Sequence, residues 1–470
     1  MIIGDYYYEF PQTLPRLEML SPYFVVFVLL CFFLSRAFQG RLRPFVLLAA
    51  NLVFLYSFSL YHLCLLCELA LVGYLFSLLL TYKKNRITLG IAVLACLAVL
   101  FFFKYQDYWK LSLTIPLGLS YVTFKLISYY ADIYTGKTKG TRNPIYFFDY
   151  VLFFSLITAG PINRFESFYQ TIANKQELEY RDAKNGGFQL MLGIFEKKVF
   201  CDFLSDVMSR ALNSGLGGLN TLLAVILYSF VIYLDFDACS NIAIGTARLM
   251  GFSIPKNFNS PYLSATIKEF WNRWHISLST WFRDYVYIPL GGNRKGKTLQ
   301  YVFIMIVFVL SGIWHGSTLN FVIWGLLHGL LRVIEDIALL PFKNSNKTIK
   351  TIARPFGILI NFVFVTFFWL FFRYQTLDQV TAVFQDIAKF TPLSLTEIGL
   401  TFNEQVWLGV VLFCVLITDI LRKHFDMLET YAKAIFPLRW LGYAVLIVIF
   451  LVFGVYGGSF AASDFIYKYF

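Results

Sequence analysis

The chain has 470 residues, of which 58% are hydrophobic and only 14% are charged, and its formal net charge is +12. A soluble chain would carry about 25% charged residues, so the composition excludes an ordinary soluble protein and predicts a membrane protein. The positive charge does not predict a nucleic-acid ligand, because the basic residues lie in short loops between apolar runs, as the positive-inside rule requires of cytoplasmic loops.

Long apolar runs recur from one end of the chain to the other and predict membrane spans. A crossing needs about 20 mostly apolar residues, and by that rule we expect roughly ten to twelve transmembrane helices with shorter, re-entrant or interfacial helices between them. The polar intervals are too short to fold alone, so we expect residues 1–470 to form a single all-α, polytopic membrane domain. The runs lie at 23–34, 63–80, 91–103, 222–234, 302–309, 358–372 and 441–455.

Charges around the first spans predict the orientation in the membrane. Three arginines lie at 36–43, in the first loop, and three basic residues lie at 83–86, two spans later. Both loops therefore fall on one side, which the positive-inside rule makes cytoplasmic. The first 18 residues carry three acidic side chains and one arginine, so we expect the N-terminus outside.

The cysteines and histidines do not form a metal-ligand pattern. Cys64 and Cys67 have the spacing of a metal or redox pair, with His62 close by, but their surroundings are apolar and no second pair follows. We therefore expect no metal site and no permanently bound cofactor.

The first polar insertion among the apolar runs reads YLDFDACSNIAIG, at 233–245. Asp235 and Asp237 lie two residues apart, directly after a long apolar run. Paired carboxylates could relay protons or bind a cation, and they could equally cap a helix or hold an arginine. We favour the structural interpretation.

The second polar segment, at 270–285, carries an aromatic stripe and a polar stripe at helical spacing. His275 lies on the polar stripe with Asn272, Ser279 and Arg283. The pattern predicts one continuous amphipathic helix that lies at an interface or re-enters the protein interior, with its polar stripe lining a cavity. A proline and two glycines then end the helix.

The third polar segment places His315 between glycines in an apolar stretch, where a lipid-facing helix should carry no ionisable side chain. Burial favours the neutral imidazole, which can act as a general base toward a hydroxyl. A histidine satisfied by a nearby carbonyl or hydroxyl is the equal alternative. His328 lies thirteen residues on, roughly 220° round an ideal helix, so it shares a face with His315 only if the helix breaks.

These three segments resemble the membrane-bound O-acyltransferase family, most closely its bacterial alginate and peptidoglycan O-acetylation branch. The resemblance rests on FDACSNIAIGTARLMGFSIPKNFNSPYL, EFWNRWHISLSTWFRDYVYIPLGGNR and LSGIWHGSTLNFVIWGLLHG, with weaker matches at 115–134 and 159–168. The run WFRDYVYIPLGGNR separates this branch from the D-alanyl-teichoic-acid acyltransferases. The chain departs from the family's FSGYSDMAIG pattern, since Asn241 replaces the aspartate and Asp237 stands where a serine is common.

The resemblance implies a ring of helices around a thin centre, where a cytoplasmic tunnel meets an outward-facing funnel. It implies that His315 is the catalytic histidine and that His275 supports the site. Among the residues near them, Asn320, Ser317 and Trp274 are candidates by type for stabilising a negative oxygen. The full set of expected supporting residues is Trp274, Asn272, Arg283, Asp284, Trp314, Ser317, Asn320 and Asp235.

The implied reaction takes an acyl group from a cytoplasmic thioester, most simply acetyl-CoA, and His315 deprotonates the attacking hydroxyl. The resemblance also implies an extracytoplasmic, esterase-like partner with a serine nucleophile, which passes the acetyl group to a polysaccharide outside the bacterial inner membrane. Three cations within four residues, Arg294, Lys295 and Lys297, form a candidate rim for the phosphates of the donor. The same rim could instead anchor the loop to membrane lipid.

Three other functions fit parts of the pattern. The chain could be a D-alanyl-teichoic-acid type acyltransferase. It could be a proton or ion transporter without acyl chemistry, in which the buried carboxylates and histidines form a path. It could also be an envelope-assembly scaffold with a decayed site, for which Asn241 is the only support.

Overall fold

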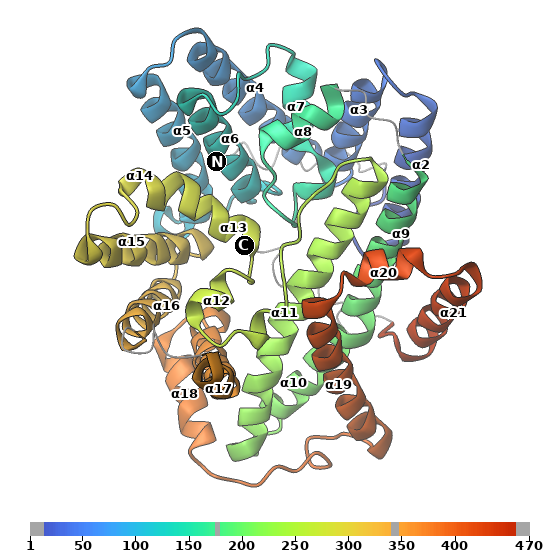
Figure 1. The fold of residues 1–470 in the computed structure, drawn as a ribbon, viewed down its shortest axis with the longest axis vertical. Helices are drawn as coiled ribbons and strands as arrows, with labels where there is room; N and C mark the ends of the chain where they lie inside the picture. Colours follow the sequence, from blue (N-terminus) through green and yellow to red (C-terminus); the bar gives the residue numbers. More distant parts are fainter. Residues whose placement is uncertain (1–13, 174–178, 340–346, 457–470) are drawn as a thin grey trace. The chain divides into compact units, whose positions relative to one another are not determined.

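The structure is a computed structural model that describes residues 14–173, 179–339 and 347–456. Every regular element in these ranges is a helix (Figure 1), and none of the residues described forms a strand. The all-α fold expected from the sequence is therefore confirmed. The chain divides into two compact units, one formed by 1–194 with 239–255 and the other by 195–238 with 256–470. The expectation of a single membrane domain stays a prediction.

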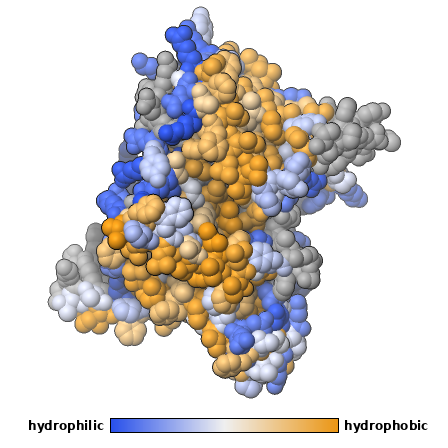
Figure 2. Space-filling model, turned by 90° about the vertical axis from the view of Figure 1, so that its right-hand side faces the viewer, coloured by the Kyte–Doolittle hydropathy of each residue, from blue (hydrophilic) through white to orange (hydrophobic). Residues whose placement is uncertain are grey.

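Seven helices in the described ranges are long and apolar enough to cross a membrane. In six of them at most 33% of the spanning window is buried, whereas 83% of the α11 window is buried. Figure 2 shows apolar residues over a broad area of the face that it draws. Soluble monomers rarely expose such areas, whereas lipid covers them in a membrane. The seven are α4 (Leu60–Tyr82), α5 (Arg86–Lys104), α11 (Gly218–Leu249), α15 (Lys297–His315), α17 (Lys347–Arg373), α19 (Phe402–His424) and α21 (Phe436–Phe453).

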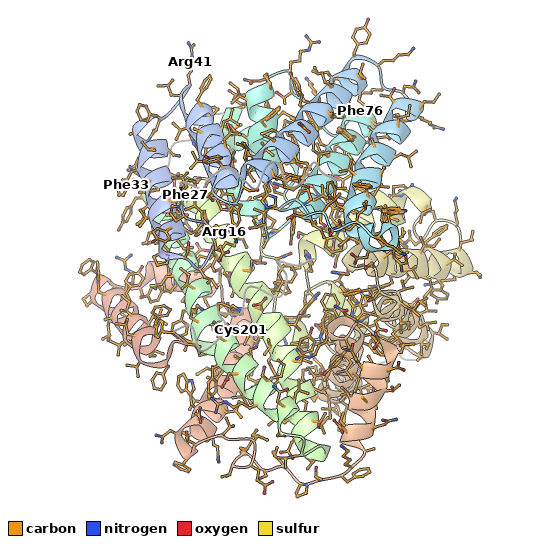
Figure 3. All side chains as sticks on the ribbon, turned by 180° about the vertical axis from the view of Figure 1, so that it is seen from behind. Arg16, Phe27, Phe33, Arg41, Phe76 and Cys201 are labelled. Carbon is orange, nitrogen blue, oxygen red and sulfur yellow. The ribbon has the colours of Figure 1, made fainter. Side chains whose placement is uncertain are left out.

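The first unit packs its helices through aromatic side chains. In α2, the ring of Phe27 lies 5.2 Å from that of Phe154, whereas Phe33 is 63% exposed and points outward (Figure 3). Besides α4 and α5, the unit contains α2 (Pro22–Ala37), α3 (Arg43–Tyr56), α6 (Leu119–Thr135), α7 (Pro144–Leu152), α8 (Phe165–Ala173), α9 (Tyr180–Phe195), two 3-10 turns (Gln106–Trp109 and Phe154–Leu156) and the end of α11.

The second unit holds both histidine segments. Its shorter elements are two π-helical turns (Glu196–Cys201 and Arg283–Tyr287), α10 (Asp202–Asn213), a 3-10 turn (Pro261–Leu263), α12 (Ile267–Trp271), α13 (Ile276–Phe282), α14 (Ile288–Leu290), α16 (Leu319–Ala338), α18 (Leu377–Ile387) and α20 (Met427–Lys433). They join the start of α11 and the long helices α15, α17, α19 and α21.

Helices α15 and α16, on either side of the turn after His315, form a closely packed pair. A Cβ atom at Gly312 would lie 2.3 Å from the carbonyl oxygen of Phe321, and one at Gly325 would lie 2.3 Å from that of Phe308. No side chain fits at such a distance, so the glycines allow the two backbones to touch. His315, the last residue of α15, lies three residues after Gly312 and thus next to this contact.

Candidate active site

The segment expected to form one continuous helix is broken at His275, so that prediction is wrong. α12 ends at Trp271, and α13 begins only at Ile276. At the break, His275 has φ 41° and ψ 55°, in the left-handed region. A residue with a Cβ rarely adopts this conformation, and such strain persists only where the surroundings hold it in place.

Asn257 holds this turn, and no periodicity within 270–285 could reveal it because it lies eighteen residues before His275. Its backbone carbonyl accepts from the N–H of Ile276 at 2.9 Å. Its Oδ1 accepts from the N–H and the hydroxyl of Ser277 at 3.2 and 2.9 Å, and it lies 3.2 Å from Nδ1 of His275. An amide oxygen only accepts, so this contact places the imidazole proton on Nδ1 and makes Nε2 the acceptor nitrogen.

The surroundings of His275 keep its ring neutral. The ring is 1% exposed and packs edge-on against Phe236, with centroids 4.6 Å apart. Burial lowers the pKa of His275 to about 3. Burial disfavours the charged form of an imidazole, so His275 serves as a hydrogen-bonding group rather than a cation.

His315 ends α15 and is 4% exposed. Its ring lies among Trp314, Trp324 and Phe372, with centroid distances of 4.5, 5.1 and 5.0 Å. The chain then turns at Gly316, where a Cβ would lie 2.2 Å from the ring of Phe321. An imidazole in this position can act as a general base toward a hydroxyl that reaches it.

His328 lies close to His315 because the helix does break between them. α15 ends at His315, and α16 begins at Leu319 after a turn of three residues. The ring of His328, which is fully buried, lies 5.0 Å from Trp324, the same indole that His315 contacts. Sequence reasoning gave His328 no role, although the glycine at 316 was the signal for the break that unites the two rings.

A chain of tryptophans connects the two histidine segments. Trp274 is the neighbour of His275. Its ring centroid lies 4.8 Å from that of Trp369, and the ring centroids of Trp369 and Trp324 are 5.9 Å apart. Trp369 and Phe372 come from α17, in the last third of the chain, where the sequence is uniformly apolar. Nothing in that run separates them from lipid-facing residues, so the sequence could not identify them.

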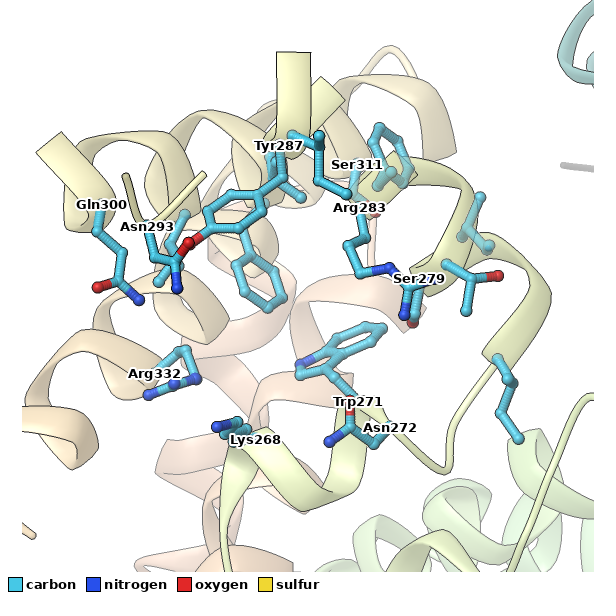
Figure 4. Close-up of a pocket in the computed structure, with 18 residues that line it drawn as sticks. Lys268, Trp271, Asn272, Ser279, Arg283, Tyr287, Asn293, Gln300, Ser311 and Arg332 are labelled. Atoms are coloured by element: carbon cyan, nitrogen blue, oxygen red, sulfur yellow. The ribbon is translucent and has the colours of Figure 1, made fainter. Parts of the chain in front are cut away.

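A cavity of about 630 Å³ opens beside these segments (Figure 4). Asn272, Ser279 and Arg283 line it, as expected of the polar stripe, whereas His275 does not belong to its lining. Ser311, one helical turn before His315, also lines it. The cavity therefore reaches the end of α15 that carries the catalytic candidate. The complete lining is Lys268, Trp271, Asn272, Ile276, Leu278, Ser279, Thr280, Phe282, Arg283, Tyr287, Ile288, Asn293, Gln300, Ile304, Val307, Phe308, Ser311 and Arg332.

Three basic side chains line this cavity, and of these sequence reasoning named Arg283 as a supporting residue but neither Lys268 nor Arg332. Lys268 on α12 and Arg332 on α16 lie on one wall, and Arg283 lies opposite with Asp284 2.9 Å away (Figure 4). The expected rim, Arg294 to Lys297, follows directly after Asn293, which lines the cavity. Within this rim, Lys297 pairs with Asp336 at 3.3 Å and Lys295 lies 5.9 Å from the ring centroid of Phe303.

The remaining expected residues have defined contacts. Asn320 is buried and donates from Nδ2 to the carbonyl of Tyr374 at 2.7 Å. Trp314 and Ser317 lie on either side of the turn that follows His315. Asn241, the departure from the family pattern, accepts a hydrogen bond from Gln189 at 3.2 Å within the first unit.

Asp235 and Asp237 both bind cations from the protein itself. The carboxylate of Asp235 lies 2.7 Å from Nζ of Lys197, and that of Asp237 lies 2.5 Å from the guanidinium of Arg422. Lys197 also lies 2.9 Å from Asp202. These contacts agree with the structural interpretation of the paired carboxylates. Across the residues that the structure describes, no three histidine, cysteine or acidic side chains are placed to hold a metal ion.

Comparison with known proteins agrees with this arrangement. The sequence profile of the membrane-bound O-acyltransferase family matches residues 137–377. The probable alginate O-acetylase AlgI of Azotobacter vinelandii is 33% identical over 77% of this chain and 75% of its own length. A peptidoglycan O-acetyltransferase of Helicobacter pylori is 31% identical over 69% and 68%, and a teichoic acid D-alanyltransferase of Streptococcus thermophilus is 35% identical over 49% and 59%. The chain belongs to the membrane-bound O-acyltransferase family and is a multi-pass membrane O-acyltransferase.

Proposed function

We propose that the protein takes an acetyl group from a thioester on the cytoplasmic side and delivers it for O-acetylation of a polysaccharide outside the membrane. The observation that carries this proposal is the position of His315, a buried imidazole at a helix end within one turn of a polar cavity. The relatives that match most of the chain are named for alginate and peptidoglycan O-acetylation. They support an acceptor polymer of one of these two classes.

In the proposed step, His315 takes the proton from an incoming hydroxyl, and the oxygen attacks the carbonyl carbon of the thioester. A C–O bond forms, the C–S bond breaks, and the departing sulfur takes the proton back from the imidazolium, so the products are an ester and a free thiol. The negative oxygen formed on the way needs hydrogen-bond donors. Ser317, Trp274 and Asn320 stay candidates, because Asn320 donates one N–H of its Nδ2 to the carbonyl of Tyr374 and the amide group has a second.

In this scheme, the donor binds in the cavity. Coenzyme A carries phosphates, which bind cations, and Lys268, Arg283 and Arg332 bring three cations to the cavity wall. We place acetyl-CoA there as the donor, with a carrier-protein thioester as the alternative. The rim from Arg294 to Lys297 would then attract the donor from bulk solution rather than hold it.

The acceptor side needs a second protein in this scheme. A chain built from membrane-spanning helices and short loops has no described domain that could grip a polysaccharide. We propose an extracytoplasmic partner with a serine nucleophile that accepts the acetyl group and passes it to sugar hydroxyls. Liposomes that contain the chain, acetyl-CoA and polymer should form no ester until this partner is added, and efficient transfer by the chain alone would contradict the scheme.

Two of the alternatives lose support. An ion transporter without acyl chemistry conflicts with the family to which the chain belongs. Transfer of D-alanine fits less well than acetylation, because the D-alanyltransferase relative matches only 49% of the chain, compared with 77% for the alginate relative. We place the protein in the bacterial inner membrane with its N-terminus outside. The acidic residues Asp5 and Glu9, on which that orientation depends, lie outside the described residues.

The experiment that tests the proposed function replaces His315 with alanine. Cells that carry His315→Ala at the normal protein level should lose polymer-bound acetate. His424→Ala is the matched control, because His424 is an exposed histidine at the end of α19 and should leave acetylation unchanged. Acetylation near the parent level in His315→Ala would remove this residue from the mechanism.

A further inference from the structure

Three nitrogen-containing rings meet between α12 and α16. The centroids of Trp271 and Trp324 are 5.7 Å apart, and His328 lies 5.1 Å from the first and 5.0 Å from the second. Each pair is edge-to-face, with interplanar angles of 75°, 82° and 67°. Side chains that can donate or accept hydrogen bonds thus gather in one small volume of the second unit.

The nitrogen atoms of these rings are buried without protein partners. In the part of the chain that the structure describes, neither Nε1 of Trp271 and Trp324 nor either ring nitrogen of His328 has a hydrogen-bond partner. Trp324 is 1% exposed and His328 is 0% exposed. An unsatisfied buried polar group destabilises the folded state, so a protein rarely keeps several together unless something else binds them.

The walls around the three rings cannot supply the missing acceptors. His328 is surrounded by Phe308, Phe368 and Trp369, at centroid distances of 6.3, 5.0 and 6.0 Å. Trp369 gives a useful contrast within the same cluster, since its indole N–H donates to the hydroxyl of Tyr262 at 3.1 Å. The indole N–H of Trp369 therefore has a protein acceptor, whereas those of Trp271 and Trp324 have none in the described residues.

The position of the three rings indicates which ligand reaches them. Trp271 and Phe308 line the cavity of about 630 Å³, and Trp324 lies 5.1 Å from the ring of His315. The rings therefore stand between the cavity and the proposed general base. A carbonyl oxygen has two lone pairs and accepts from two N–H donors, whereas an apolar chain end would leave the nitrogens unsatisfied.

We propose that Trp271, Trp324 and His328 form a subsite that binds the carbonyl oxygen of the donor's acyl group and positions it beside His315. This inference rests on the proposed function, because it takes the cavity as the donor site. The two indole N–H groups donate to the oxygen, and His328 lies beside both of them. The subsite favours a donor that carries a carbonyl next to sulfur over one of the same shape without it.

The test compares two coenzyme A analogues that cannot transfer an acyl group. Acetonyl-CoA keeps a ketone close to the thioester position, and propyl-CoA replaces that ketone with a methylene. With the full chain in lipid nanodiscs, we expect the parent to bind acetonyl-CoA about tenfold more tightly than propyl-CoA, because propyl-CoA leaves the buried N–H donors without an acceptor. Trp324→Phe and Trp271→Phe keep an aromatic ring, remove the N–H and should bring the ratio of the two affinities toward one.

The affinity ratio separates positioning from general damage, because a loosened fold weakens both analogues alike. Trp369→Phe is the matched control, since its N–H serves Tyr262 and its loss should leave the ratio unchanged. Equal binding of both analogues by the parent, or an unchanged ratio in the Trp271 and Trp324 variants, would overturn the subsite while leaving the donor cavity in place. Failure of the parent to bind either analogue would overturn the donor assignment itself, and the subsite with it.

Discussion

Two buried polar regions of the second unit differ in whether their buried polar groups have partners within the protein. Around Lys197, which is 1% exposed, every charge has an opposite charge close by, from Asp235 at 2.7 Å to Asp202 at 2.9 Å. Around Trp324, buried nitrogens lie among aromatic rings with no acceptor in the described structure. The first region is complete without a ligand, and the second is not. Satisfaction of hydrogen bonds, rather than polarity itself, therefore distinguishes a structural cluster from a candidate binding site.

The ionic cluster connects helices that are distant in the sequence. Lys197 and Glu196 lie on the π-helical turn before α10, Asp235 and Asp237 lie on α11, and Arg422 lies on α19. Arg422 pairs with Asp237 and lies 3.9 Å from Glu196, so one side chain joins all three elements. Buried charges of this kind cost several kcal/mol each to desolvate and are tolerated only when paired.

The largest expected effect comes from breaking this pairing. Lys197→Met leaves the carboxylate of Asp235 buried without its cation, and loss of one partner of a buried pair typically costs about 3–5 kcal/mol. We expect a large drop in the thermal unfolding temperature of the protein in detergent. Lys197→Met with Asp235→Asn should recover part of the loss because it removes the stranded charge. Lys389→Met, which breaks an exposed pair with Asp386, is the control and should change little. Equal stability of all three variants would show that the cluster does not hold the fold.

A smaller effect is expected at the strained turn beside the aromatic region. Because His275 hydrogen-bonds to Asn257 rather than lining the cavity, His275→Ala should reduce acetylation less than the roughly 10²–10⁴-fold loss typical of removing a general base. His275→Gly removes the same ring but relieves the left-handed backbone, so it should be about 1 kcal/mol more stable than the alanine variant. Polymer acetylation and thermal unfolding of the two variants, beside His315→Ala, test both statements. If His275→Ala alone were inactive, the two histidines would exchange roles.

The same comparison explains how far the sequence could lead. Apolar runs predicted the all-α fold, and a lone histidine between glycines made His315 the catalytic candidate, because both signals are local. The break at His275 depends on Asn257, and the aromatic walls depend on Trp369 and Phe372 in a uniformly apolar helix. Neither can be read from periodicity, since a tertiary hydrogen bond overrides helix propensity and a buried aromatic residue resembles a lipid-facing one. A structural role for Asp235, as a helix cap or an arginine partner, was the favoured expectation, but its partner Lys197 could not be named from the sequence.

The smallest expected effect concerns the exposed cations from Arg294 to Lys297, which contrast with the buried charges around Lys197. Exposed charges interact weakly and are screened by salt, so each contributes on the order of 0.2–1 kcal/mol. One of the three, Lys297, already pairs with Asp336, which reduces the charge open to a ligand. Replacing all three with glutamine should therefore raise the apparent KM for acetyl-CoA by roughly two- to tenfold and leave kcat unchanged, because the rim attracts the donor but does not touch the reacting atoms.

Salt dependence separates capture of the donor from anchoring to lipid. In the parent protein, higher ionic strength should raise the KM for acetyl-CoA, whereas in the glutamine variant the KM should depend less on salt. Lys268→Gln is the matched comparison, because Lys268 lines the cavity itself. The rise in KM that this variant causes should persist at high salt. A lipid anchor would give another pattern: an unchanged KM at every salt concentration, with weaker attachment of the loop to anionic membranes. That result in a correctly inserted variant would leave the cavity cations as the only basic residues that hold the donor.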